Sequence, residues 1–199
     1  MAKRIRAAAW RFGMRAVLAA GLMALAIGTA RPPHVAAASA CGPTVNPVAC
    51  ENQNAGSPAS LWDVSSAGDA SIQGFATDIS VAPGDTQSFK IDTDAAAYAI
   101  DIYRMGYYRG DGARKIASIT PSAVLPQRQP TCLSVPATGL VDCGTWAVSA
   151  SWVVPATAVS GIYFAKLTRN DTGGASHIFL VVRDDINRSE ILFQTSDTT

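Results

Sequence analysis

Residues 162–183 read IYFAKLTRNDTGGASHIFLVVR, and this stretch decides the fold class. Two apolar runs, 162–169 and 177–183, flank the segment Asn170-Asp171-Thr172-Gly173-Gly174. Asn, Asp and Gly favour the tight turn of a β-hairpin, because they accept positive φ angles at little cost. The stretch therefore predicts two neighbouring antiparallel strands.

The same alternation of apolar and polar side chains occurs in two earlier segments. Residues 145–154 (TWAVSASWVV) place apolar side chains at positions 146, 148, 150 and 152, and residues 98–104 (YAIDIYR) place them at positions 98, 100 and 102. Successive side chains of a strand point to opposite faces of its sheet, so each segment predicts a strand with one buried face.

Further strands are predicted at 71–81, 86–92, 114–119 and 189–195. The signal Pro83-Gly84-Asp85 separates the first two, and it is typical of a turn. About eight short strands at this spacing predict an all-β protein, an immunoglobulin-like β-sandwich. Gly161-Ile162-Tyr163 resembles the corner of such folds, in which a tyrosine hydroxyl bonds back to the chain before its own strand. Alternatively, Tyr163 is an ordinary edge residue.

The first forty residues are typical of a secretory signal peptide. They contain six basic and no acidic side chains, an uncharged run at 17–30, and the small-residue pattern Ala38-Ser39-Ala40. The uncharged run has 14 residues, fewer than the roughly 20 that span a bilayer, which disfavours the alternative of a retained anchor. We therefore expect a secreted, periplasmic or cell-surface protein without a membrane span after cleavage. Lipid anchoring at Cys41 is the minor alternative.

Residues 41–199 contain ten basic and fifteen acidic side chains, a net charge of −5. Binding to nucleic acid depends on a concentrated basic face, so the sequence argues against a nucleic-acid partner.

The four cysteines form two local pairs in the sequence, and in an exported chain they favour disulfides over metal ligands. Four cysteines allow three connectivities, of which we favour Cys41–Cys50 and Cys132–Cys143. Neither pair has the spacing of a zinc site. The predicted organisation is a signal peptide at 1–40, an irregular disulfide-pinned segment at 41–60, the β-sandwich at 61–188, and a strand at 189–199 that leads toward a further domain.

Tyrosines, arginines and glycines concentrate in the loop of residues 103–114, which we name the Tyr/Arg loop. Large aromatic side chains and arginines are enriched in binding sites, so the loop is a candidate site for a glycan or a cell-surface protein. The alternative, which we favour, is a structural loop whose tyrosines cover one end of the sandwich. The Arg109-Gly110-Asp111 tripeptide matches an adhesion signal, but a tripeptide has little specificity. The candidate binding residues are Tyr103, Arg104, Tyr107, Tyr108, Arg109, Asp111 and Arg114.

No arrangement of residues predicts catalysis, a cofactor or a metal site. His177 falls in a predicted strand and is interpreted as a partly buried sheet residue rather than a base. Asp92-Thr93-Asp94 offers oxygen ligands for Ca²⁺, but the Gly and Glu of an EF-hand loop do not follow, so a solvated turn is the favoured interpretation.

Several segments together resemble a known family. They are 46–64 (NPVACENQNAGSPASLWDV), 74–85 (GFATDISVAPGD), 100–117 (IDIYRMGYYRGDGARKIA), 176–185 (SHIFLVVRDD) and 191–199 (ILFQTSDTT). They resemble the N-terminal β-sandwich region of large exported proteins similar to the N,N-dimethylformamidase large (beta) subunit. The Tyr/Arg loop is the most specific part, and this chain has Arg109 where the family usually has glycine.

The resemblance implies that a larger α/β domain follows the segment matched by 191–199 and carries the iron-binding and amide-hydrolysing residues. No catalytic or metal residue is therefore transferred to this chain. The first hypothesis is a non-catalytic domain that supports this following domain or a split partner chain. The second is a free-standing surface-binding module, and the third is that the chain itself hydrolyses an amide.

Overall fold

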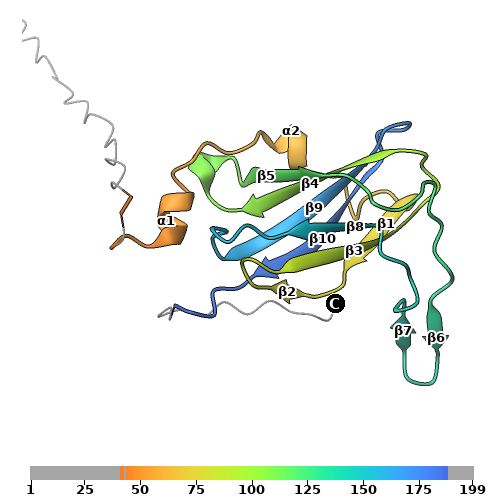
Figure 1. The fold of residues 1–199 in the computed structure, drawn as a ribbon. Coiled ribbons are helices and arrows are strands. Elements are labelled where there is room, and N and C mark those ends of the chain that lie inside the picture. Colours follow the sequence, from red (N-terminus) through yellow and green to blue (C-terminus); the bar gives the residue numbers. More distant parts are fainter. Residues whose placement is uncertain (1–40, 43, 188–199) are drawn as a thin grey trace, which may run out of the picture. The chain divides into compact units, whose positions relative to one another are not determined.

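The computed structural model describes residues 41–42 and 44–187, and within them eight strands form two sheets (Figure 1). The three-stranded sheet has the order β1 (Ile72–Ala76), β3 (Thr86–Thr93), β8 (Ala150–Val153). The five-stranded sheet has the order β2 (Ser80–Val81), β10 (Ala175–Val182), β9 (Gly161–Arg169), β4 (Tyr98–Met105), β5 (Ala113–Ile119). Neighbouring strands are antiparallel except β2 and β10, which are parallel. The predicted all-β sandwich is confirmed.

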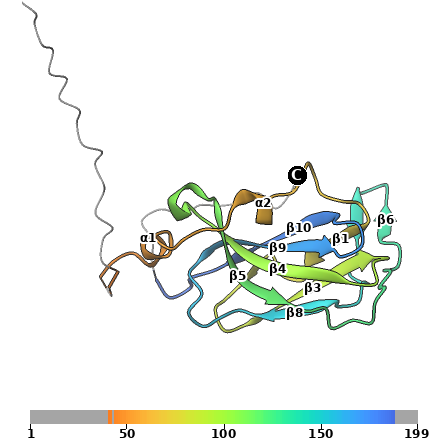
Figure 2. The same ribbon diagram turned by 90° about the horizontal axis from the view of Figure 1, so that it is seen from above.

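Figure 2 shows the strands of the sandwich from above. The core lies between the two sheets and consists of side chains from alternate positions of each strand. Phe89 and Ile91 of β3 face Ile100, Ile102 and Leu167 of the other sheet, and each is at most 1% exposed. Burial of one such side chain stabilises the fold by about 1.5–3 kcal/mol. These residues occupy every second position of their strands, and this period of two is the pattern that the sequence displays.

The hairpin of residues 162–183 is confirmed as β9 and β10, whose register pairs Phe164 with Phe179. The tyrosine corner is confirmed as well. The hydroxyl of Tyr163 is buried and donates a hydrogen bond of 2.7 Å to the carbonyl oxygen of Val159. This bond fixes the turn that leads into β9 against the strand itself.

The single strand predicted at 71–81 is wrong in detail, because β1 and β2 belong to different sheets. Between them, the backbone nitrogen of Thr77 donates to the carbonyl oxygen of Ser88 (2.9 Å), and its hydroxyl lies 3.0 Å from the carboxylate of Asp78. These local bonds stabilise a bend, and the chain crosses there from one sheet to the other.

The strand predicted at 145–154 is shorter than expected, since β8 covers only Ala150–Val153. The side chain of Ser149 accepts a hydrogen bond from the backbone nitrogen of Ile91 (2.8 Å) and donates one to its carbonyl oxygen (3.2 Å). It thereby occupies the backbone groups that a longer β8 would pair with. Val148 consequently lies 43% exposed instead of in the core.

Residues 133–142 form a short hairpin that the sequence did not predict. Strands β6 (Leu133–Val135) and β7 (Leu140–Asp142) pair with each other as a separate two-stranded sheet. The Cys132–Cys143 disulfide closes its base, with the two Cα atoms 4.4 Å apart. In Figure 1 the hairpin projects away from the sandwich.

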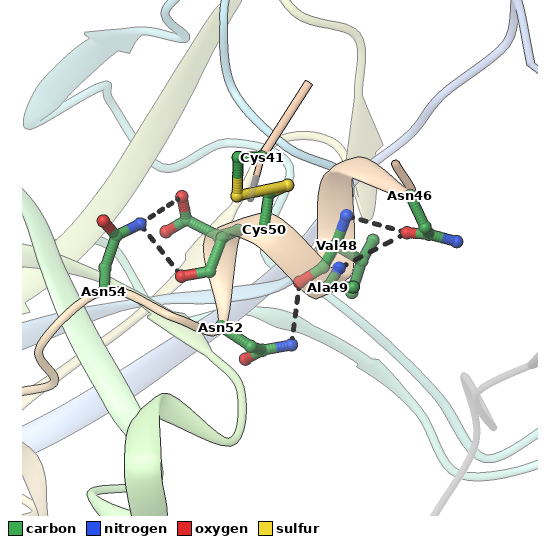
Figure 3. The surroundings of a disulfide bond; sticks show 8 residues. Cys41, Asn46, Val48, Ala49, Cys50, Asn52 and Asn54 are labelled. Carbon is green, nitrogen blue, oxygen red and sulfur yellow. Dashed lines mark hydrogen bonds between the residues drawn. A yellow bond between two sulfur atoms is a disulfide. The ribbon is translucent and has the colours of Figure 1, made fainter. Parts of the chain in front are cut away.

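The segment at 41–60 is less irregular than predicted, because it contains helix α1 (Pro47–Glu51) and the start of α2 (Ala59–Trp62). The side chain of Asn46 caps α1 by accepting hydrogen bonds from the backbone nitrogens of Val48 and Ala49 (Figure 3). The predicted Cys41–Cys50 disulfide is present and joins the start of the segment to α1.

The predicted signal peptide and the predicted strand at 189–195 lie outside the described residues. Within the described residues, no helix is long and apolar enough to cross a membrane.

Candidate functional site

The Tyr/Arg loop connects the adjacent antiparallel strands β4 and β5 and contains one turn of 3₁₀-helix, η1 (Tyr108–Gly110). The pairing of β4 with β5 shifts register between Ile102 and Tyr103. The extra residue, Ile116, lies in β5, and β4 keeps a regular register with β9 through Arg104. Tyr103 and Arg104 therefore point to opposite faces of the sheet, and both are buried because each face is covered at this end of β4.

Arg104 is 2% exposed and ties the loop to the corner that precedes β9. Its guanidinium donates to the carbonyl oxygens of Val159 (3.3 Å), Ser160 (2.8 Å) and Met105 (3.1 Å), and to the hydroxyl oxygen of Tyr108 (3.0 Å). The carbonyl oxygen of Val159 also accepts the hydrogen bond of the tyrosine corner. Arg104 therefore fixes two loops at the same end of the sandwich.

Glu51, at the end of α1, accepts hydrogen bonds from three donors of the loop on one carboxylate oxygen. The hydroxyl of Tyr108 lies 2.9 Å from Oε1, and Nε and Nη2 of Arg114 lie 2.8 Å and 2.7 Å from it. The second carboxylate oxygen accepts a hydrogen bond of 3.1 Å from Asn54. Tyr108 has no exposed surface, and its burial raises the pKa of its hydroxyl. Charge-assisted bonds of this kind are stronger than neutral ones, so Glu51 anchors α1 on the loop.

Backbone groups extend this contact along the disulfide-pinned segment. The backbone nitrogen of Tyr107 donates to Oδ1 of Asn52 (2.7 Å), and Arg109 donates to the carbonyl oxygen of Gln53 (3.0 Å). The side chain of Asn52 also donates back into α1, where it reaches the carbonyl oxygen of Val48 (Figure 3). The Tyr/Arg loop therefore contacts the disulfide-pinned segment at three consecutive residues, Glu51, Asn52 and Gln53.

Arg109 has a backbone φ of 61°, in the left-handed region that favours glycine. A residue with a Cβ atom in this conformation costs roughly 1–2 kcal/mol. A glycine at this position would adopt the conformation without strain. Arg109 is therefore tolerated in a turn that glycine fits better.

Most of the seven predicted binding residues hold the fold together. Tyr103 stacks on Phe164 with 5.3 Å between the ring centroids and donates to the carbonyl oxygen of Leu61 (3.2 Å). Arg104, Tyr108 and Arg114 make the contacts described above. Tyr107 and Asp111 remain exposed, and Tyr107 is 71% exposed. The sequence analysis did not identify Glu51 or Asn52, because only the fold brings these residues to the loop.

A group of aromatic side chains covers the outer face of the five-stranded sheet, opposite the core. We name it the outer aromatic cluster, and it consists of Trp62, Tyr103, Phe164, His177 and Phe179. His177 is half-buried, its Nε2 lies 2.6 Å from the carbonyl oxygen of Trp62, and burial lowers the pKa of the imidazole. Phe179 is 57% exposed, so the cluster has an open apolar side.

The aspartates considered for Ca²⁺ are engaged with arginines. Arg128 pairs with Asp92 (3.3 Å) and with Asp94 (3.0 Å), and Arg169 pairs with Asp94 and Asp171. The hydrogen bond from Arg169 lowers the pKa of Asp171 to about 2. In the part of the chain that the structure describes, no three His, Cys, Asp or Glu side chains gather in a way that could hold a metal ion.

Comparison with known proteins gives one family match. The family model described as "N,N-dimethylformamidase beta subunit-like, C-terminal" matches residues 99–199. The match begins in β4 and includes the whole Tyr/Arg loop and strands β5–β10. No curated protein matches the chain.

Proposed function

The chain belongs to the N,N-dimethylformamidase beta subunit-like family, and we propose that it is a non-catalytic exported β-sandwich domain that supports another domain of a family protein. The supported partner is a following domain on the same polypeptide or a split partner chain. The proposal places the chain in the N-terminal region of such proteins. The matching family model is described as C-terminal, so the match does not support a place in the N-terminal region, and this placement stays a prediction.

The observation that carries the proposal is the internal use of the reactive side chains of the Tyr/Arg loop. Amide hydrolysis requires an activated nucleophile or metal-bound water, a base within hydrogen-bond reach and a group that stabilises the oxyanion. Tyr108 and Arg114 both donate to Glu51, and Arg104 donates to backbone carbonyl oxygens. These four groups stabilise the fold, and their contacts favour a structural role over a catalytic one.

The open side of the outer aromatic cluster supports the second half of the proposal. Phe179 projects from β10 next to Phe164 and His177, and it is 57% exposed. This side chain, together with the half-buried His177, offers another folded unit an apolar contact next to the buried Phe164. Export is supported by the two disulfides, which persist in oxidising compartments.

An activity assay tests the non-catalytic part. The secreted full chain is purified, refolded with and without iron, and assayed with N,N-dimethylformamide and formamide. We expect no turnover above the buffer blank. Turnover that Tyr107→Phe or Tyr108→Phe abolishes, in variants that keep the circular dichroism spectrum, would contradict the proposal and support the amide-hydrolase hypothesis.

A co-purification assay tests the supporting role. The chain is co-expressed with the polypeptide that is encoded directly downstream of Thr199. We expect the two to co-purify and Phe179→Asp to weaken the association. Val153→Asp is the matched control, since Val153 is 66% exposed on the other sheet and should not matter. Equal recovery with both variants would argue against the outer aromatic cluster as the contact surface.

The exposed part of the Tyr/Arg loop favours a second candidate function. In this function the chain is a surface-binding module for a glycan or a cell-surface protein. Tyr107 is 71% exposed, and an exposed tyrosine offers a flat apolar face with a polar tip. A glycan array probed with the secreted chain tests this function. Binding that Tyr107→Ala removes would favour the module, whereas an array without signal leaves the supporting role as the better proposal.

A further inference from the structure

The hairpin β6–β7 exposes apolar side chains away from the sandwich. Leu133 is 56% exposed, Leu140 is 50% exposed and Val141 is 66% exposed. The register pairs Leu133 with Asp142, Ser134 with Val141 and Val135 with Leu140. Directly paired residues lie on the same face, so Leu133, Val135 and Leu140 lie on one mainly apolar face with Asp142 at its end, and Val141 lies on the other face with Ser134.

The hairpin also has unpaired strand edges. Among the described residues, neither β6 nor β7 pairs with a third strand. An isolated two-stranded hairpin is marginally stable in water, and its free backbone groups are a template for another strand. The Cys132–Cys143 disulfide and the turn at Gly139, whose backbone nitrogen donates to the carbonyl oxygen of Val135 (3.0 Å), hold the two strands in place. The edges are therefore pre-ordered for pairing.

The two edges differ in what they can accept. Pro136 directly follows β6, and proline cannot donate a hydrogen bond to a neighbouring strand. Neither strand itself contains a proline, but no proline adjoins β7, which Gly139 precedes. A further strand can therefore pair past the end of β7 but not past the end of β6 at Pro136.

Charge indicates which strand would pair with it. Asp142 is the one charged side chain of the hairpin at residues 133–142, whereas residues 41–199 have ten basic and fifteen acidic side chains and a net charge of −5. Two copies of the chain therefore repel each other less at the hairpin than elsewhere. An edge strand is also complementary to itself about a twofold axis, as a closed dimer requires.

We propose that β7 pairs antiparallel with β7 of a second copy of this chain, centred on Val141. The two hairpins then form one four-stranded sheet whose apolar face carries Leu133, Val135 and Leu140 of both copies. In this register Asp142 lies opposite Leu140 of the second copy, so the two Asp142 carboxylates are not directly opposed. The contact is small, and the dimer is of the weak, transient class. This dimer does not depend on the supporting role proposed above.

Sedimentation velocity of the secreted full chain over a range of concentrations tests the proposal. We expect a dimer whose fraction rises with concentration. Val141→Lys should weaken association by at least about tenfold, because it places two like charges at the centre of the pairing. Val153→Lys is the matched control, since Val153 has the same exposure of 66% on β8, the edge strand of the three-stranded sheet. A chain that stays monomeric throughout, or a dimer that Val141→Lys leaves intact, overturns the proposal.

Cysteine cross-linking tests the register and separates this contact from the outer aromatic cluster. Val141→Cys should form an intermolecular disulfide under mild oxidation, and Val153→Cys should not. Peptide mapping confirms that Cys132–Cys143 is retained in each variant. Phe179→Asp should leave the dimer unchanged. A dimer that dissociates with Phe179→Asp and does not cross-link through Val141→Cys would assign self-association to the outer aromatic cluster and overturn the pairing of β7.

Discussion

The hydroxyl of Tyr108 donates a hydrogen bond of 2.9 Å to Glu51, which lies 57 positions earlier in the chain. Tyr108 has no exposed surface, and the side chain of Glu51 is 11% exposed. The contact joins the disulfide-pinned segment to the sandwich through an ionised acceptor and a buried donor. Such a pair is costly to break, since the partner that remains loses its bond without gaining water.

Glu51→Ala should lower the free energy of unfolding by about 1–3 kcal/mol, because Tyr108 and Arg114 lose a shared acceptor. Urea unfolding followed by tryptophan fluorescence measures the change. Asp111→Ala is the control, since this exposed carboxylate of the same loop should change stability by no more than about 0.5 kcal/mol. Equal effects of the two substitutions would show that Glu51 does not anchor the segment.

Arg109→Gly should raise the free energy of unfolding by roughly 0.5–1 kcal/mol, because glycine adopts a φ of 61° without strain. Part of the gain is lost to the greater freedom of glycine in the unfolded chain and to the missing bond with Gln53. Arg109→Ala keeps the strain and should not stabilise the protein. Thermal unfolding of both variants distinguishes relief of strain from removal of the arginine side chain.

Tyr163→Phe should lower the free energy of unfolding by about 1–2 kcal/mol, because the carbonyl oxygen of Val159 loses the shorter of its two hydrogen bonds and keeps only the one of 3.3 Å from Arg104. Tyr107→Phe removes a hydroxyl from a side chain that is 71% exposed and should have little effect. Chemical unfolding of the two variants gives the comparison. A tyrosine corner that contributes nothing would appear as two equal, small changes.

Stability should fall as the pH rises from about 10 to about 12. Burial raises the pKa of Tyr98 and of Tyr163 to about 12, whereas an unfolded tyrosine has a pKa of 10.0. In this window the unfolded chain releases protons that the folded chain retains, so unfolding becomes more favourable by at most about 1.4 kcal/mol per pH unit for each tyrosine. Tyr163→Phe should make the decline shallower. A decline of the same slope in this variant would assign the effect to other groups.

Export should remove residues 1–40 and leave Cys41 paired with Cys50, as it is in the structure. Intact-mass and non-reducing peptide analysis of secreted protein measure both. A diacylglyceryl group on the Cys41 sulfur excludes this disulfide, so a lipoprotein would carry the added mass together with a free Cys50 thiol. Secreted protein that still carries Met1 would contradict the signal-peptide interpretation.

The features that the sequence predicted well depend on interactions between near neighbours in the chain. Each of these features joins residues at most eleven positions apart in the chain. They are the turn between β9 and β10, the corner from Val159 to Tyr163, and both disulfides. Turn residues, the spacing of cysteines and the period of two express these contacts directly.

Two of the features that the sequence missed, the short β8 and the role of Glu51, depend on partners far away in the chain. Ser149 shortens β8 by bonding to Ile91, 58 positions distant, and Glu51 reaches the Tyr/Arg loop over a similar span. A serine next to a strand and a glutamate at the end of a short helix carry no local signal of these roles. The Tyr/Arg loop was therefore recognised as a candidate site, while the residue that engages most of its donors was not.

The division of the strands between the sheets limits how this protein can be dissected. The family match begins at residue 99, but β1 and β3, which form most of the three-stranded sheet, precede it. A polypeptide of residues 99–199 would retain β4 and β9 without the Phe89 and Ile91 side chains that cover them. The region that matches the family model is therefore not expected to fold by itself. A shortened protein for expression should begin upstream of the Cys41–Cys50 disulfide.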